Sequence, residues 1–250
     1  MPRVRRIVEA GLVREVKDMF TGRIHTPGVT RRPRGETTGE AQKAANRKRL
    51  IEETRWKLNA NYSAGDLHTV WHYSGDVGLE QADKNEKKIL RLLREWCVRN
   101  GVKWKAAAVI EVKGKRGVNI HHHIILPDIP MAVMRELWER VIGEGKGTVT
   151  ATALDRRGNH GKLAEYLLKY SDAADKMWRE LGRRRHRISW ARGMVTPKPR
   201  YIIISSGHWR KEPKAGKGWI LLKDDNGEVC REGYTEGGWP YREYFELKLE

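Results

Sequence analysis

The chain has 250 residues, of which 39% are hydrophobic and 33% charged, enough for one sizeable core with a smaller appendage. Its apolar runs are too short to cross a bilayer and its N-terminus lacks an apolar signal segment, so we expect a soluble, cytoplasmic protein without a membrane partner. The two cysteines, Cys97 and Cys230, argue against a disulfide scaffold and a cysteine-built zinc site. The formal net charge of +18 favours nucleic acid as a partner, although ribosomal and membrane-surface proteins are basic too.

The first part of the chain is richer in Lys and Arg than in Asp and Glu. Its stretch TPGVTRRPRGETTGE has the Pro, Gly and Thr content of a mobile loop. We interpret residues 1–60 as a basic, poorly packed N-terminal arm that includes a helix.

Helical and strand patterns alternate over residues 61–207, which we expect to form the main domain. In chain order they predict a strand at 66–75, a helix at 79–101, hairpin strands at 105–113 and 118–126, a helix at 131–142, a strand at 147–155, a helix at 159–182 and a last central strand at 200–206. This order indicates an α+β fold with a mainly antiparallel central sheet of about five strands flanked by helices. Residues 208–250 predict a small C-terminal β extension.

Three consecutive histidines interrupt a run that otherwise predicts a buried strand, GVNIHHHIILPD at residues 117–128. Successive side chains of a strand point to opposite faces, so His121 and His123 share one face and His122 lies on the other. Two imidazoles in a strand rich in Ile and Leu are costly to bury without partners. We therefore interpret His121 and His123 as metal ligands rather than as polar residues at a wet edge, and His122 as structural.

A carboxylate is expected beside this pair. If GKRG at residues 114–117 is the turn of the hairpin, Glu111 lies opposite or next to His121. Two histidines and one carboxylate suit a divalent ion that acts as a Lewis acid, and Mn²⁺, Mg²⁺, Co²⁺ and Zn²⁺ are all compatible. The expected ligands are Glu111, His121 and His123, and this ligand set alone does not choose among the four metals.

The long helix predicted at 159–182 carries the motif EYLLKYS. Tyr166 and Tyr170 are four residues apart and so lie one above the other, and Lys169 flanks Tyr166. The tyrosines share the apolar stripe of the helix, so packing at the edge of the core is the alternative to a catalytic role.

The histidine pair on a strand, followed by a helix with Tyr-x-x-Lys-Tyr, resembles the HUH endonuclease superfamily, in particular the rolling-circle replication initiators of phages and plasmids. LHTVWHYSG is similar to the family's first strand motif, and SWARGMVTPKPRY to a stretch that follows the tyrosine helix in some phage initiators. The chain departs from the pattern at His122, which occupies the usually apolar middle position. It departs again at Ala173, where two-tyrosine initiators often have Lys.

The resemblance implies a metal-dependent endonuclease that nicks and joins single-stranded DNA at a replication origin. Metal held by Glu111, His121 and His123 polarises the scissile phosphate, and the hydroxyl of Tyr166 or Tyr170 attacks it, leaving a 5′-phosphotyrosine and a free 3′-OH. Because the unperturbed pKa of tyrosine is about 10, the metal or Lys169 is expected to favour the phenolate. A host polymerase and a host helicase are the expected partners.

Two alternatives stay open at this stage. A transposase or relaxase of the same superfamily would share the site chemistry and differ in its DNA ends. A basic nucleic-acid-binding protein without enzymatic activity would explain the charge but leave the arrangement of Glu, His and Tyr to chance.

Overall fold

The computed structural model describes residues 3–20, 39–113, 119–183, 185–205, 212–235 and 238–249. Within them the chain is α+β with antiparallel sheets and four helices, which confirms the predicted fold class. It divides into two compact units: unit 1 comprises residues 1–60 and 196–250, and unit 2 comprises residues 61–195. None of the helices in the described ranges has the length and hydrophobicity needed to cross a membrane.

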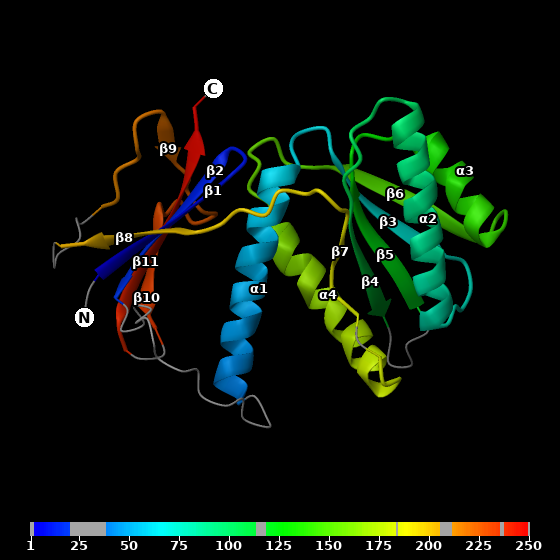
Figure 1. The fold of residues 1–250 in the computed structure, drawn as a ribbon, viewed down its shortest axis with the longest axis horizontal. Helices are drawn as coiled ribbons and strands as arrows, with labels where there is room; N and C mark the ends of the chain where they lie inside the picture. The colour runs from blue at the N-terminus through cyan, green and yellow to red at the C-terminus, as the bar shows by residue number, and fades with distance from the viewer. Residues whose placement is uncertain are drawn as a thin grey trace. The chain divides into compact units, whose positions relative to one another are not determined.

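Unit 2 is built on a five-stranded sheet in the order β6-β3-β5-β4-β7, and every neighbouring pair is antiparallel (Figure 1). Its strands are β3 (Leu67–Tyr73), β4 (Ala107–Lys113), β5 (Asn119–Leu126), β6 (Gly147–Ala153) and the short β7 (Ser189–Trp190). The strand β5 is central, and its residues from His122 to Leu126 are all buried. The predicted turn at 114–117 lies outside the described residues.

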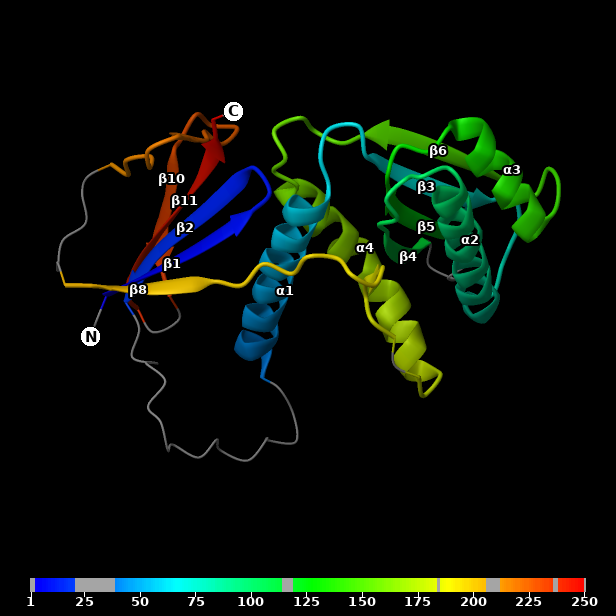
Figure 2. The same cartoon turned by 45° about the horizontal axis from the view of Figure 1, so that its top comes forward.

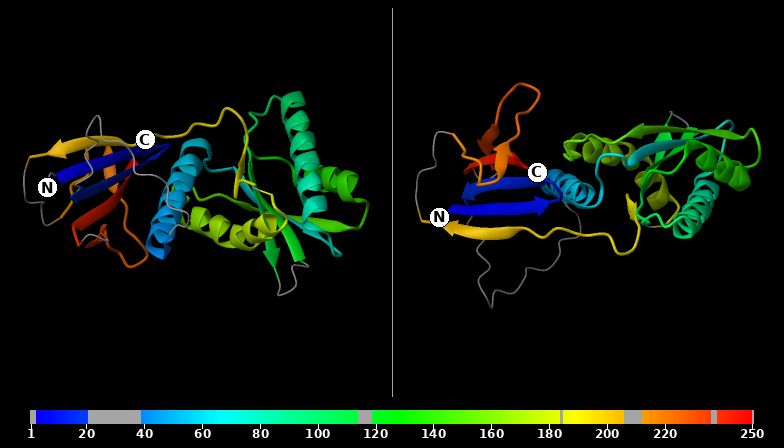
Figure 3. Two further views of the ribbon diagram at one scale, coloured as in Figure 1. Left: turned by 60° about the horizontal axis from the view of Figure 1, so that its bottom comes forward. Right: turned by 90° about the horizontal axis from the view of Figure 1, so that it is seen from above.

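Helices lie on both sides of this sheet, α2 (Leu79–Arg99) and α3 (Met131–Ile142) on one side and α4 (Gly161–Glu180) on the other (Figure 3). The apolar face of α2 buries Ile89 and Leu93 against Trp71 and Ile124 of the sheet, so the main core of unit 2 lies on that side. Fully burying each aliphatic side chain contributes roughly 1.5–3 kcal/mol.

The second sheet, in unit 1, joins segments from the two ends of the chain (Figure 2). Its order is β10-β11-β2-β1-β8, with β9 also paired to β11. Its strands are β1 (Arg3–Ala10), β2 (Val13–Phe20), β8 (Arg200–Ile204), β9 (Trp219–Leu221), β10 (Cys230–Tyr234) and β11 (Pro240–Lys248), and α1 (Glu40–Asn61) accompanies them. Gly11, at φ +60°, makes the tight turn between β1 and β2, where a Cβ would lie 2.1 Å from the carbonyl oxygen of Asn59.

Charged side chains are buried in unit 1 because they pair with one another. Glu15 accepts hydrogen bonds from Arg6 at 2.5 Å and from the indole of Trp56 at 2.6 Å. Glu52 of α1 accepts one from Arg6 at 2.8 Å and lies 3.5 Å from Lys17. These pairs attach α1 to one face of the sheet.

Three features differ from the sequence-based expectation. Residues 3–20 are two paired strands with a buried face rather than part of a poorly packed arm, whereas the helix expected before residue 60 is present as α1. Residues 200–204 form a strand as expected, but β8 pairs with β1 and not with the sheet of unit 2. The hydrophobic pattern of RYIII specifies a strand and does not specify its partner. The C-terminal strands β9 to β11 likewise belong to the sheet of unit 1 rather than to a separate extension. The chain passes from unit 1 to unit 2 after residue 60 and returns to unit 1 at residue 196.

Candidate active site

The register of β3, β4 and β5 brings the predicted metal ligands onto one face of the sheet in unit 2. Glu111 of β4 is directly paired with His121 of β5, one of the two positions expected for a hairpin with its turn at residues 114–117. His123 is paired with Val109 on one side and with Val70 on the other. Because partners in a pair point to the same face, Glu111, His121 and His123 project from the side of the sheet that α4 approaches.

The three side chains meet at one carboxylate oxygen. Glu111 Oε2 lies 2.7 Å from His123 Nε2 and 3.6 Å from His121 Nδ1. Glu111 and His123 are almost completely buried, whereas 18% of the His121 side chain is exposed. Burial of a carboxylate is costly unless it has charged or hydrogen-bonding partners, and His123 supplies a hydrogen bond to Glu111.

These residues fit a divalent metal ion. Glu111 Oε2 is near a nitrogen of each imidazole, and a donor set of two histidines and one carboxylate suits Mn²⁺, Mg²⁺, Co²⁺ or Zn²⁺. His121 is the member of the set that solvent reaches. Glu111, His121 and His123 are the residues that would hold the ion.

The predicted nucleophile lies against this group. The ring of Tyr166, on α4, meets the ring of His123 edge-on with 5.3 Å between centroids. Lys169 is exposed on the same helix, one turn further along. The backbone of Tyr170 belongs to α4, and its side chain lies outside the described part of the structure. The fold therefore brings Tyr166 to His123 from a helix more than forty positions later in the chain.

Two further histidines on β3 join this face, and sequence reasoning missed both. His68 Nε2 lies 3.1 Å from His123 Nδ1, with the two rings stacked, and the ring of Tyr166 meets His68 edge-on at 5.9 Å. His72 is paired with His121, and their ring centroids are 4.3 Å apart. The four-residue spacing of His68 and His72 puts both on one face of a strand, which the sequence does show, but the face could not be known without the register.

The environment of His68 keeps its imidazole neutral. Burial, together with the neighbouring His123, lowers the pKa of His68 to about 4. At neutral pH one ring nitrogen therefore donates a hydrogen bond and the other accepts one.

His122 points to the opposite face, as predicted, and takes part in a different network. Tyr73 lies with its hydroxyl 2.8 Å from His122 Nε2 and accepts a hydrogen bond from Asn85 at 3.1 Å. His122 Nδ1 lies 3.2 Å from the buried carboxylate of Glu86, which also accepts a hydrogen bond from Arg185. This network satisfies the polar groups at the usually apolar middle position and makes His122 compatible with a buried strand.

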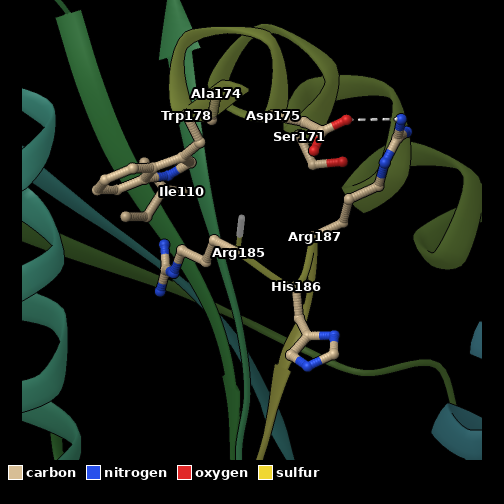
Figure 4. Close-up of a pocket in the computed structure, with 8 residues that line it drawn as sticks. All are labelled: Ile110, Ser171, Ala174, Asp175, Trp178, Arg185, His186 and Arg187. Atoms are coloured by element: carbon tan, nitrogen blue, oxygen red, sulfur yellow. Dashed lines mark hydrogen bonds and ion pairs between the residues drawn. The ribbon is translucent and has the colours of Figure 1, made fainter. Parts of the chain in front are cut away.

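The segment after α4 is tied to helices on two sides by arginines. Arg185 pairs with Glu86 and, at 3.0 Å, with Asp83, both on α2. Arg187 pairs with Asp172 and, at 3.0 Å, with Asp175 on α4 (Figure 4).

The side chains of Arg185 and Arg187 leave the segment in different directions (Figure 4). Between the segment and α4 lies a small cavity whose lining includes Trp178 and Ser171. Ala174 and Trp178 pack on Ile110, so the C-terminal half of α4 lies against β4.

Comparison with known protein families adds an independent observation. Residues 66–175 match the family model described as Replication-associated protein ORF2/G2P. The matched segment lies within unit 2, begins just before β3 and ends within α4, so it contains the three candidate ligands, both tyrosines and Lys169. It covers less than half of the chain. Searches of curated proteins and of solved structures gave no match.

The part of unit 2 that carries the candidate site is thus similar to replication-associated proteins. This similarity supports a role of this segment in replication initiation and an interaction with DNA. Unit 1 lies entirely outside the matched residues.

Proposed function

We propose that unit 2 nicks and rejoins single-stranded DNA at a replication origin, in the manner of an HUH-type rolling-circle initiator. The observation that carries this proposal is the contact between Tyr166 and His123, a nucleophile candidate placed against a histidine whose Nε2 faces a buried carboxylate. The match of this segment to replication-associated proteins supports the same role.

The reaction is a transesterification at phosphorus. The hydroxyl oxygen of Tyr166 forms a bond to the phosphorus while the bond from phosphorus to the 3′ oxygen breaks. The phenolic proton leaves Tyr166, and a proton is taken up by the departing 3′ oxygen. The products are a 5′-phosphotyrosine and a free 3′-OH, which a host polymerase can extend after a host helicase has separated the strands.

Glu111, His121 and His123 would hold a divalent ion, which when bound would polarise the scissile phosphate and stabilise the charge that develops on it. Burial of Glu111 and His123 fixes the positions of these two side chains. The partly exposed His121 lies at the open side, where the phosphate can be reached. Exposed Lys169, three residues after Tyr166 on α4, is the cation proposed to assist this nucleophile.

The site face also offers a surface for a DNA strand. The edge strand β6 exposes Thr148, Thr150 and Thr152, and the register places Thr148 beside His72 and Thr152 beside His68. Hydroxyl groups donate hydrogen bonds to phosphate and sugar oxygens without reading sequence. The positive charge of the chain supplies attraction to the phosphates.

A covalent-adduct experiment tests the proposal. The intact protein is incubated with Mn²⁺ or Mg²⁺ and a single-stranded origin oligonucleotide that is labelled at its 3′ end. The label is then in the fragment that becomes linked to tyrosine through its 5′ phosphate, and the adduct is resolved on a denaturing gel. Tyr166→Phe retains the ring and its contacts with His123, so we expect an unchanged melting temperature and loss of the adduct.

The variants Tyr170→Phe and Tyr166→Phe/Tyr170→Phe separate the two tyrosines. If the tyrosines alternate, each single variant cleaves once but fails to join strands, and only the double variant forms no adduct. A 5′-linked adduct formed by the double variant would overturn the assignment, because the nucleophile would then lie outside α4.

A further inference from the structure

We infer that His68 is a positioning residue for the metal ligand His123: when an ion occupies Nε2 of His123, Nε2 of His68 accepts the Nδ1 proton of His123 and so fixes which nitrogen of His123 faces the ion. This inference rests on the proposed function, and the experiment below separates it from the nicking reaction itself. The family match contains His68 but assigns no role to it.

The geometry of His123 leaves its two ring nitrogens in different environments. Nε2 lies 2.7 Å from Glu111 Oε2, on the side of the candidate ion. Nδ1 lies 3.1 Å from Nε2 of His68. Because the two nitrogens of an imidazole point in different directions, His68 lies at the nitrogen of His123 that points away from an ion held at Nε2.

Ligation at Nε2 determines the protonation state of the rest of the ring. The Nε2 lone pair is then used by the ion, so the single proton of neutral His123 sits on Nδ1. A buried N–H needs an acceptor, and His68 Nε2 is within hydrogen-bond distance. In metal sites this outer partner fixes the tautomer and the ring orientation of the ligand and raises its basicity.

The surroundings hold His68 in the orientation that this role requires. Its ring stacks on that of His123 with 5.3 Å between centroids and an interplanar angle of 22°. Tyr166 meets both rings edge-on. The three rings therefore pack as a group in which His68 supports the ligand, and the nucleophile contacts both histidines.

Metal affinity measured by calorimetry with Mn²⁺ alone tests the inference on the full chain. His68→Leu removes the acceptor, so we expect the dissociation constant for Mn²⁺ to rise by about tenfold or more. His68→Gln retains an acceptor on a side chain of similar reach and should recover part of that affinity. His186→Gln, at an exposed histidine of the same unit, is the matched control and should bind Mn²⁺ like the parent.

A spectroscopic measurement distinguishes positioning from a general structural effect. In Zn²⁺-loaded protein, long-range ¹H–¹⁵N correlation of the imidazoles should show His123 protonated at Nδ1, with a slowly exchanging proton that is lost in His68→Leu. Thermal melts of the metal-free variants establish that each one folds.

The outcomes separate the two proposals. Equal Mn²⁺ affinity in His68→Leu and the parent, a His123 protonated at Nε2 with metal present, or no Mn²⁺ binding by the parent would each overturn the inference. Weakened Mn²⁺ binding in His68→Leu without any DNA adduct in the parent would leave the role of His68 intact and overturn the nicking proposal alone.

Discussion

Glu111 contacts His123 more closely than it contacts His121, although His121 is its direct partner in the β4–β5 ladder. The nearest approach to His123 is 2.7 Å and that to His121 is 3.6 Å, both from the same carboxylate oxygen. The side chain therefore reaches diagonally across the pair of strands. One carboxylate oxygen therefore lies near both imidazoles, so a substitution of Glu111 should affect both candidate histidine ligands.

Glu111→Gln is such a substitution. The amide is nearly isosteric with the carboxylate, so the fold should be retained, but its oxygen carries no full charge and is a weaker ligand for a hard divalent ion. We expect the affinity for Mn²⁺ to fall by more than about tenfold. This loss should be at least as large as the loss expected for His68→Leu, which removes only the hydrogen-bond partner of a ligand. Calorimetry on the metal-free protein gives the measurement, and unaltered affinity would remove Glu111 from the ligand set.

Binding of single-stranded DNA should depend steeply on salt. Each phosphate neutralised by Lys or Arg releases counterions, so the affinity of a protein that makes several such contacts should fall about a hundredfold between ~50 and ~200 mM salt. Fluorescence anisotropy with a labelled oligonucleotide measures this slope. A flat response would show that the net charge of +18 does not serve DNA binding.

Arg185→Gln should destabilise unit 2. The arginine pairs with the buried carboxylate of Glu86, and removal of one partner from a buried pair typically costs about 3–5 kcal/mol. Arg183→Gln is the matched control, because its partner Glu80 is largely exposed and such surface pairs contribute about 0–1 kcal/mol. Urea unfolding of the two variants should differ accordingly, and equal midpoints would contradict a role of Arg185 in holding the segment after α4.

Glu52 and Glu243 of unit 1 should have opposite effects on how the stability of the fold depends on pH. Burial alone would raise the pKa of Glu52, but the hydrogen bond and charge of Arg6, with the charges of Lys17 and Arg55, leave this pKa below its ordinary value. A lowered carboxyl pKa contributes stability above the unfolded pKa of about 4.3, and that stability is lost as the pH falls through the folded pKa. Glu52→Gln should therefore lower the melting temperature at pH 7, with a smaller difference from the parent below about pH 4.

Glu243 serves as the comparison for Glu52. Burial and the charge of Glu15 raise the pKa of Glu243, so its contribution is present at low pH and is lost as the pH rises through the folded pKa. Glu243→Gln should consequently lower the melting temperature at pH 7 much less than Glu52→Gln. Calorimetric melts at several pH values measure both, and equal losses at pH 7 would contradict the assigned directions.

Much of the site geometry could be predicted from the sequence because it depends on local rules. Alternation along one strand places His121 and His123 on a common face, and the short connection between β4 and β5 limits where Glu111 can lie. The apolar residues of α4 recur at helical spacing, so the sequence also predicts this helix. The assignment of Glu111, His121, His123, Tyr166, Tyr170 and Lys169 to their chemical roles stays a prediction.

Features that depend on distant pairing could not be predicted in the same way. Nothing in RYIII distinguishes β1 from the strands of unit 2 as its partner. The segment RVRRIVEA looks like a solvated arm because its arginines are numerous, yet Arg3 and Arg6 are buried through ion pairs with acidic residues from other strands and from α1. His68 was missed because its partner on β5 is set by the register of β3.

The strand order of unit 1 has a consequence for how this chain folds as it is made. Strand β11 is paired with β2, yet unit 2 is synthesised in full between them. Because unit 2 is continuous in sequence, it can complete its own sheet during translation, whereas β2 must wait for residues 240–248 before its second edge is paired. A nascent chain halted after residue 195 would thus present a finished site-bearing unit together with an open, aggregation-prone strand edge.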